Sequence, residues 1–293
     1  MNLFYLIIHI IFAIGMFLSL KVVNSKNINK YQAITINYII AFVLTALFYG
    51  KPLSFAISSM SQPLMIASLW VGFLFIFSFI LMSFSTIKAG IGITTALNKM
   101  SVVIPVLVGM LYLNQTDELL LKIAGIILAV ISFVLILFNS KDDKVGLKAL
   151  YLPLSVFLVS GLIDTSMEIV NKKLINPDTP QEIFLLGIFA TASIIGVISI
   201  LFDLFKKGNN SKLTMKPILW GTVMGIFNFL VSKMILVNVG LMGGSVVFPV
   251  HNASVVMITA LSGVIFFKEK FTKRQWIGVG VAIISVVLIA TTI

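Results

Sequence analysis

The chain has 293 residues, of which 59% are hydrophobic and only 11% are charged, and its mean hydropathy is +1.11. Because soluble domains carry about 25% charged residues, this composition excludes an ordinary soluble protein and indicates an integral membrane protein. The net charge of +11 does not indicate nucleic-acid binding, since the lysines fall in short gaps between apolar runs, as they do in membrane loops.

The apolar runs predict the spanning elements in chain order. The first, in MNLFYLIIHIIFAIGMFLSL, lacks a basic leading region and a small-residue cleavage site, so we expect a retained span and not a cleaved signal peptide. A span needs about 20 apolar residues, and continuous apolarity favours helices over the alternating pattern of a barrel. The ten predicted spans are 3–23, 31–50, 63–86, 90–113, 118–138, 149–171, 181–204, 217–237, 241–267 and 273–292.

The two halves of the chain resemble each other. LWVGFLFIFSF at 69–79 matches LWGTVMGIFNF at 219–229, and a second match aligns the SVV triplets that begin at Ser101 and Ser254. In this second register Gly125 and Ser132 fall on Gly278 and Ser285. Because five spans is an odd number, the second half enters the membrane inverted, which is typical of secondary transporters. We therefore predict an all-α protein of ten transmembrane helices in two inverted five-helix repeats, 1–138 and 149–293, joined by a loop at 139–148.

Lys99 lies near the middle of the fourth predicted span, in TALNKMSVVIP. In the repeat register, Asn98 and Lys99 fall on His251 and Asn252, so each half places a polar pair near the midplane, where transporter sites lie. A lysine at a helix centre costs about 2.5–3.5 kcal/mol on insertion scales unless it finds water or a partner. Three interpretations stay open: Lys99 lines a cavity, it forms a structural ion pair with Asp164 or Glu168, or the predicted span is misplaced.

Prolines and small polar residues accompany these pairs. Pro105 and Pro249 each remove one helical hydrogen bond, to the carbonyls of Ser101 and Ser245. Ser101 shares a helix face with Asn98 and Pro105, because their spacing follows the helical repeat. We therefore include Ser101 among the candidate substrate-binding residues.

The sixth predicted span carries acidic residues in GLIDTSMEIVNKK. Asp164 and Glu168 lie four residues apart on one helix face, where two ionised carboxylates repel each other, an arrangement suited to proton uptake and release. Glu168 lies close to Lys172 and Lys173, so it also fits a wet interfacial position.

Further candidates lie in the eighth and ninth spans. His251 has a side chain that titrates near neutral pH, although a lone histidine is as often a packing residue. Asn252 follows it, and Asn228 shares a face with Ser232. His9 and the three tryptophans are interpreted as interfacial or packing residues. The candidate substrate-binding residues are Asn98, Lys99, Ser101, Asp164, Glu168, Asn228, His251 and Asn252.

The ten spans, the five-plus-five repeat, TALNKMSVVIPVLVGMLYL and NASVVMITALSGVIFFKEKFTKRQWIGVGVAIISVVLI resemble the drug/metabolite transporter superfamily, EamA type. Halves in this family typically carry a proline in the fourth helix, a glutamate at its exit and a glycine-rich fifth helix. Pro105 and Glu269 each supply one of these features in one half only, whereas Gly125 and Gly278 supply the third in both. The resemblance implies a secondary transporter, often an exporter, with a central cavity lined by helices 1, 3, 4, 6, 8 and 9.

These observations together favour an exporter or exchanger of a small metabolite in the cell membrane, working by alternating access. Lys99 is expected to hold an anionic group such as a carboxylate, and Asp164, with Glu168, an amine or a coupling proton, which suits a zwitterion such as an amino acid. A non-transporting membrane protein, such as a lipid scramblase or a scaffold, is the alternative. The chain has no cysteine and none of the common catalytic or nucleotide-binding motifs, so we expect no enzyme activity, no cofactor and no metal site. The sequence does not indicate an oligomeric state.

The basic residues give a prediction of orientation. Most of the 21 Lys and Arg residues fall in the gaps after the first, third, fifth, seventh and ninth predicted spans. Since cytoplasmic loops carry the excess of positive charge, these gaps are predicted to be cytoplasmic, with both termini outside. The family resemblance more often implies that the termini are inside.

Overall fold

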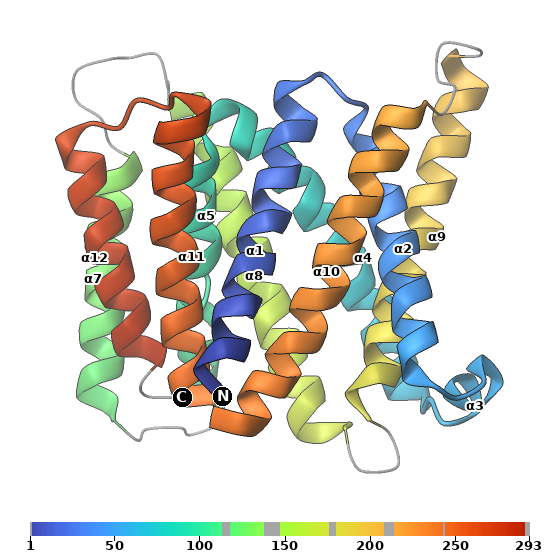
Figure 1. Ribbon diagram of the computed structural model, residues 1–293. Coiled ribbons are helices and arrows are strands. Elements are labelled where there is room, and N and C mark those ends of the chain that lie inside the picture. Colours follow the sequence, from blue (N-terminus) through green and yellow to red (C-terminus); the bar gives the residue numbers. More distant parts are fainter. Residues whose placement is uncertain are drawn as a thin grey trace.

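The computed structural model describes residues 2–112, 118–137, 147–175, 180–207, 214–242 and 244–290, and every regular element within these ranges is an α-helix. The helices stand side by side as a bundle (Figure 1). They are α1 (Asn2–Ser25), α2 (Lys30–Tyr49), α3 (Leu53–Ser58), α4 (Gln62–Lys88), α5 (Ile91–Met100), α6 (Val103–Tyr112), α7 (Leu119–Leu137), α8 (Leu147–Lys173), α9 (Gln181–Lys207), α10 (Met215–Met242), α11 (Gly244–Phe267) and α12 (Lys273–Ala290).

Five helices contain stretches long and apolar enough to cross a membrane, namely Phe4–Ser25, Lys30–Tyr49, Gln62–Lys88, Gln181–Phe202 and Met215–Met234. Three shorter apolar stretches lie in α7, α8 and α11. This composition is that of an integral membrane protein. α1 begins and α12 ends at the same end of the bundle (Figure 1).

The fourth predicted span, 90–113, is not one helix. It is divided into α5 and α6 at Ser101 and Val102, which form a turn. The Ser101 N–H donates to the Asn98 carbonyl at 3.3 Å, and the Ile104 N–H donates to the Ser101 carbonyl at 2.9 Å, so the turn closes over three residues and not four. Pro105, four residues after Ser101, has no N–H to continue the helical pattern, which explains why the break lies there.

Residue choice fixes the other helix ends. α2 begins at Lys30 because the Asn29 side chain accepts the Gln32 N–H at 3.2 Å, and it ends at Tyr49 because Gly50, which follows, has φ +72°. α4 begins after Ser61, whose hydroxyl accepts the Leu64 N–H. The short helix α3 lies in the gap after the second predicted span and was not predicted.

The first residues of α5 are held by a side chain from the other half. Glu269, in the loop between α11 and α12, accepts the Ile91 N–H at 2.8 Å, and its Oε1 lies 2.6 Å from Lys21 Nζ of α1. Lys21 also donates to the Thr86 carbonyl of α4 at 3.2 Å. Gly90 adopts φ +87°, and a Cβ there would lie 2.7 Å from Glu269 Oε2, so only glycine allows this approach. One carboxylate therefore ties α1, α5 and the α11–α12 loop together.

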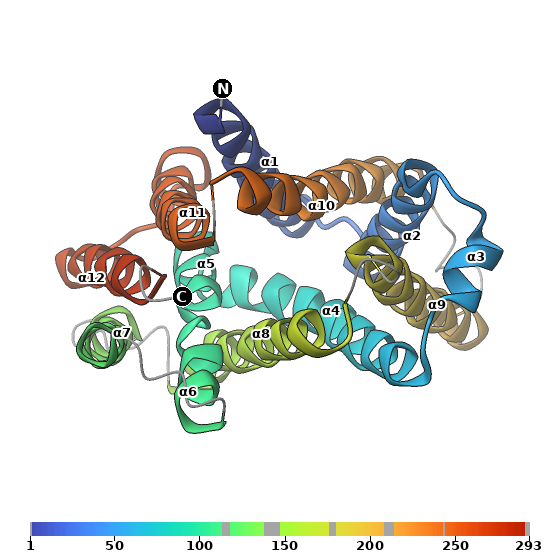
Figure 2. The same cartoon turned by 90° about the horizontal axis from the view of Figure 1, so that it is seen from below.

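Equivalent helices of the two halves make equivalent contacts with the opposite half. α1 packs against α10 as α8 packs against α4, and α1 packs against α11 as α8 packs against α5. α7 and α12 lie side by side at one edge of the bundle, with α2 and α9 at the opposite edge (Figure 2). Ser132 of α7 donates to the Gly278 carbonyl at 2.8 Å, and Ser285 of α12 donates to the Gly125 carbonyl at 2.7 Å. Residues that the sequence repeat equates thus make reciprocal hydrogen bonds.

Two hydrophobic clusters form the core. The larger consists mainly of buried residues of α1, α2, α4 and α9, and the smaller mainly of buried residues of α5, α7, α11 and α12. α1 and α11 pack against each other, as do α5 and α8. These two helix contacts form the boundary between the two hydrophobic clusters, and polar side chains gather there.

Candidate functional site

Lys99, His251 and His9 form a row of basic side chains at this boundary. Lys99 lies in the last turn of α5, and its Nζ is 3.4 Å from Nε2 of His251 on α11. The His251 ring stacks on the His9 ring of α1, with ring centroids 4.2 Å apart and planes 9° apart. The structure therefore brings Lys99 and His251 together from the two halves of the chain and adds His9, which the sequence analysis assigned to packing or an interface.

Asp164 of α8 approaches the same helix break from the other side. Its Oδ2 lies 3.0 Å from the Ser101 hydroxyl, which also lies 2.6 Å from the Asn98 carbonyl. Since a hydroxyl has one hydrogen, Ser101 serves only one of these acceptors at a time. No other hydrogen bond to Asp164 occurs within the described ranges, so its carboxylate has capacity left for a ligand.

Lys99 and Asp164 attract each other electrostatically, but no ion pair within 4.0 Å joins them in the part of the chain that the structure describes. The ion pair that the sequence analysis considered for these two residues is therefore not formed. The two opposite charges flank the Ser101 turn and stay separate. This separation leaves both charges available to a third group.

Asp164 is exposed, and it lies away from the apolar exposed stripe of α8. The exposed apolar residues of α8 recur on one face, at Leu154, Leu158 and Leu162. Asp164 follows Leu162 by two residues, which turns it about 200° around the helix to the opposite face. Its exposed surface therefore lies on a different face of α8 from the apolar stripe.

Asn98 connects helices and points its amide away from Lys99. Its Nδ2 donates to Ser160 Oγ of α8 at 2.7 Å and lies 3.6 Å from Met82 Sδ of α4. Asn98 thus positions α5 against α8 close to the turn. Asn252, which follows His251 in the sequence, is largely buried, with 9% of its surface exposed.

Two candidates do not join this cluster. Asn228 is buried on α10, and its amide donates to Asn37 Oδ1 of α2 at 3.3 Å, which makes it a contact between those two helices. The backbone of Glu168 belongs to α8, but its side chain lies outside the described residues. Within the described ranges, no group of three or more His, Asp or Glu side chains is arranged to hold a metal ion.

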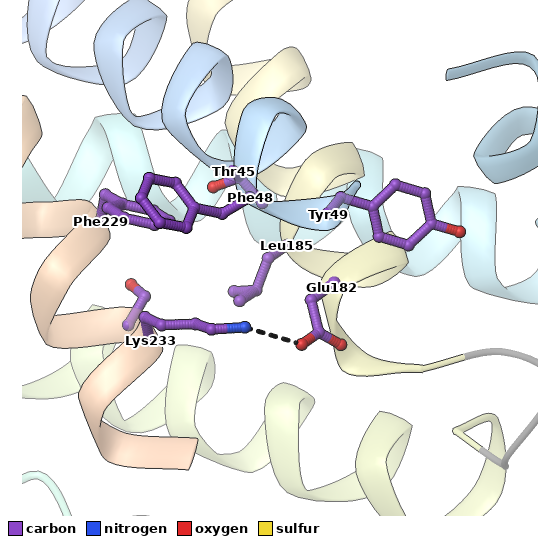
Figure 3. Close-up of a pocket in the computed structure, with 8 residues that line it drawn as sticks. Thr45, Phe48, Tyr49, Glu182, Leu185, Phe229 and Lys233 are labelled. Carbon is purple, nitrogen blue, oxygen red and sulfur yellow. Dashed lines mark hydrogen bonds and ion pairs between the residues drawn. The ribbon is translucent and has the colours of Figure 1, made fainter. Parts of the chain in front are cut away.

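A separate small pocket lies between α2, α9 and α10 (Figure 3). Its lining includes Phe48, Leu185 and Phe229, and Lys233 Nζ lies 3.2 Å from Glu182 Oε1 at its edge. Its volume of about 10 Å³ is room for about one water molecule. The pocket is too small for a metabolite, and its lysine already has a partner.

Known proteins are similar to this chain in sequence and in fold. Residues 152–291 match the model of the EamA-like transporter family. An uncharacterized protein from Haemophilus influenzae (strain ATCC 51907 / DSM 11121 / KW20 / Rd) is 26% identical over 284 residues, which cover 94% of this chain and 93% of that protein. A solved crystal structure superposes with a TM-score of 0.63 at 12% identity, over 99% of this chain and 97% of its own, which shows a shared fold.

Proposed function

Because the chain is an EamA-type member of the drug/metabolite transporter superfamily, matched over residues 152–291, we propose that it is a secondary transporter of a small zwitterionic metabolite. The proteins of this family are transporters, and the apolar helices make this chain an integral membrane protein. The proposal extends these facts to the site, the chemical class of substrate and the mechanism.

Ten spanning segments in two inverted halves, 1–138 and 149–293, are part of the proposal. The reciprocal hydrogen bonds of Ser132 and Ser285 support it, since a two-fold relation between the halves requires that each contact occur twice. α5 and α6 together make the fourth segment of the first half, and α11 makes its counterpart. α3 is too short to span a membrane.

The single observation that carries the proposal is the separation of Lys99 from Asp164. A scaffold stabilises charges in its interior by pairing them, because an unpaired charge in a low-dielectric interior is costly. Here one charge contacts a histidine, the other contacts a serine hydroxyl, and Asp164 is accessible. This arrangement favours a site that a ligand completes.

The signs of the charges specify the substrate class. Lys99 attracts a carboxylate and Asp164 attracts an amine, and the two lie on opposite sides of one turn at a broken helix. Broken helices are where secondary transporters bind their substrates, since backbone groups freed at the break face the ligand. In alternating access the two halves rock around this site, driven by an ion gradient, for which a proton is the coupling ion we propose.

A lipid scramblase is the alternative function from another class. It requires a polar groove open to lipid along the length of a helix, whereas the exposed face of α8 at Leu154, Leu158 and Leu162 is apolar. The observations therefore favour transport.

The test is an untargeted comparison of metabolites in cells without the protein, with the wild type, and with Lys99→Ala or Lys233→Ala at equal membrane abundance. We expect at least one zwitterionic metabolite to change with the wild type and with Lys233→Ala, and to return to background with Lys99→Ala. Lys233 is the matched control because it is a lysine of a spanning helix already paired with Glu182. Wild-type activity in Lys99→Ala would refute the role of this lysine.

A further inference from the structure

His9 is a buried imidazole whose two nitrogen atoms have no hydrogen-bond partner among the described residues. None of its surface is exposed, and neither Nδ1 nor Nε2 makes a hydrogen bond to the part of the chain that the structure describes; the same holds for Nδ1 of His251. A buried polar group left without a partner costs about 1–3 kcal/mol. A purely packing role for His9 does not explain this cost, because an apolar side chain of similar shape avoids it.

The charges that face the two rings are all basic. Lys99 of α5 acts on both histidines, the histidines act on each other, and Asp164 of α8 acts on Lys99. The other titratable groups described on neighbouring helices lie near helix ends or have partners of their own. They include Tyr5, near the start of α1; Lys21, paired with Glu269; Lys88, in the last turn of α4; Lys216, in the first turn of α10; Lys233, paired with Glu182; and Lys273 and Arg274, in the first turn of α12.

Repulsion limits how many protons this row holds. Two unit positive charges 4 Å apart repel by about 4 kcal/mol at an effective dielectric constant of 20. Lys99 Nζ lies 3.4 Å from His251 Nε2, and the centroids of the stacked His9 and His251 rings are 4.2 Å apart. While Lys99 is charged, its repulsion disfavours protonation of either ring. Protonation of both rings at once is disfavoured more strongly, because the two rings also repel each other.

A carboxylate beside Lys99 removes this opposition. Its negative charge offsets that of Lys99, so the row can accept one further proton from water, on a ring nitrogen that has no other partner. The proton and the anion then favour each other's binding, and by linkage each raises the affinity of the other equally.

We infer that His9 and His251 form a proton-binding pair linked to a carboxylate group held by Lys99, so that the proton and the substrate bind together. This inference rests on the proposed function and assigns the coupling proton to the histidine pair and not to Asp164. It predicts that proton and substrate cross the membrane in the same direction. Asp164 is left to hold the amine.

The chain suits a direct test because it contains only two histidines. Labelling histidine with ¹⁵N in the full-length protein, in lipid nanodiscs at pH 6.5, gives two sets of imidazole signals whose shifts report the protonated fraction of each ring. Acetate is the probe for the carboxylate, and methylammonium is the control cation. We expect acetate to raise the summed protonated fraction, by no more than one proton per chain, and methylammonium to leave it unchanged.

Two variants separate the parts of the inference. In Lys99→Gln, protonation without acetate should rise, because the repelling charge is gone, and the response to acetate should be lost. In His9→Gln, the response of the remaining His251 signal to acetate should fall at least several-fold. The inference is overturned if acetate leaves both rings unchanged in the wild type, or if His251 responds fully in His9→Gln. Either result leaves the proposed function standing if the metabolite changes still depend on Lys99.

Discussion

Glu269→Gln tests how strongly one carboxylate joins the two halves. In the wild type Glu269 accepts the charged Lys21 ammonium at 2.6 Å and the Ile91 N–H at 2.8 Å, and these two charged side chains are only 14% and 12% exposed. The substitution removes the negative charge, so the Lys21 ammonium keeps only neutral partners, which are the new amide oxygen at position 269, the Thr86 carbonyl and the Phe267 ring. Breaking a largely buried pair in this way costs about 3–5 kcal/mol, because a charge is left without its partner.

The matched control is Glu182→Gln, which breaks the pair with Lys233. That pair is longer, at 3.2 Å, and its side chains are 29% and 36% exposed, so its loss should cost less than about 1 kcal/mol. The free energy of unfolding is measured by reversible titration of the purified protein from mild detergent into sodium dodecyl sulfate, followed by circular dichroism.

A double substitution checks the reason for the cost. Lys21→Met combined with Glu269→Gln leaves no unpaired charge, so the double variant should lose less stability than the sum of the two single variants. The reasoning is refuted if Glu269→Gln and Glu182→Gln cost the same, or if the two single effects at Lys21 and Glu269 simply add.

Three more predictions concern the site, the repeat and the orientation. Asp164→Asn should abolish transport of the zwitterion, while the histidine protonation response to acetate survives; loss of that response would return the coupling proton to Asp164. Ser132→Ala and Ser285→Ala should each lower the free energy of unfolding by about 1 kcal/mol, since each removes one buried hydrogen bond of equal geometry; a cost at one serine only would contradict the reciprocal contact. A reporter active only in the cytoplasm, fused after Ile293, should give no signal if the excess of basic residues sets the orientation; a strong signal would place both termini inside.

The helices were largely predictable because long apolar runs have few other solutions in a membrane. The short helix α3 was not predicted, since six residues are too few to give such a signal. Pro105 indicated a freed carbonyl at Ser101, but a proline alone does not tell a bend from the full break between α5 and α6. Pro249 shows the difference, because α11 continues through it.

The site was predictable only where the repeat gave each residue a counterpart. The register that aligns Lys99 with Asn252 placed the polar pairs of both halves together, and the structure brings Lys99 to His251. His9 has no counterpart of this kind, and its partner ring lies on a helix far along the chain. A polar residue near the middle of the first span was the only available signal. Likewise, the sequence marks Glu269 as a family feature, but not as the cap of α5.

A water-filled site between the halves is tested most directly by the reactivity of a thiol. The chain has no cysteine, so Asp164→Cys and Leu162→Cys each introduce a single one, on opposite faces of α8. A charged, membrane-impermeant methanethiosulfonate reagent reacts with a thiol only where water reaches it. The reagent is applied to sealed vesicles from one side of the membrane and then, in a separate experiment, from the other. We expect rapid labelling of the Asp164→Cys protein from each side and no labelling of the Leu162→Cys protein. An unreactive thiol at position 164, or equal labelling at both positions, would contradict the proposed site.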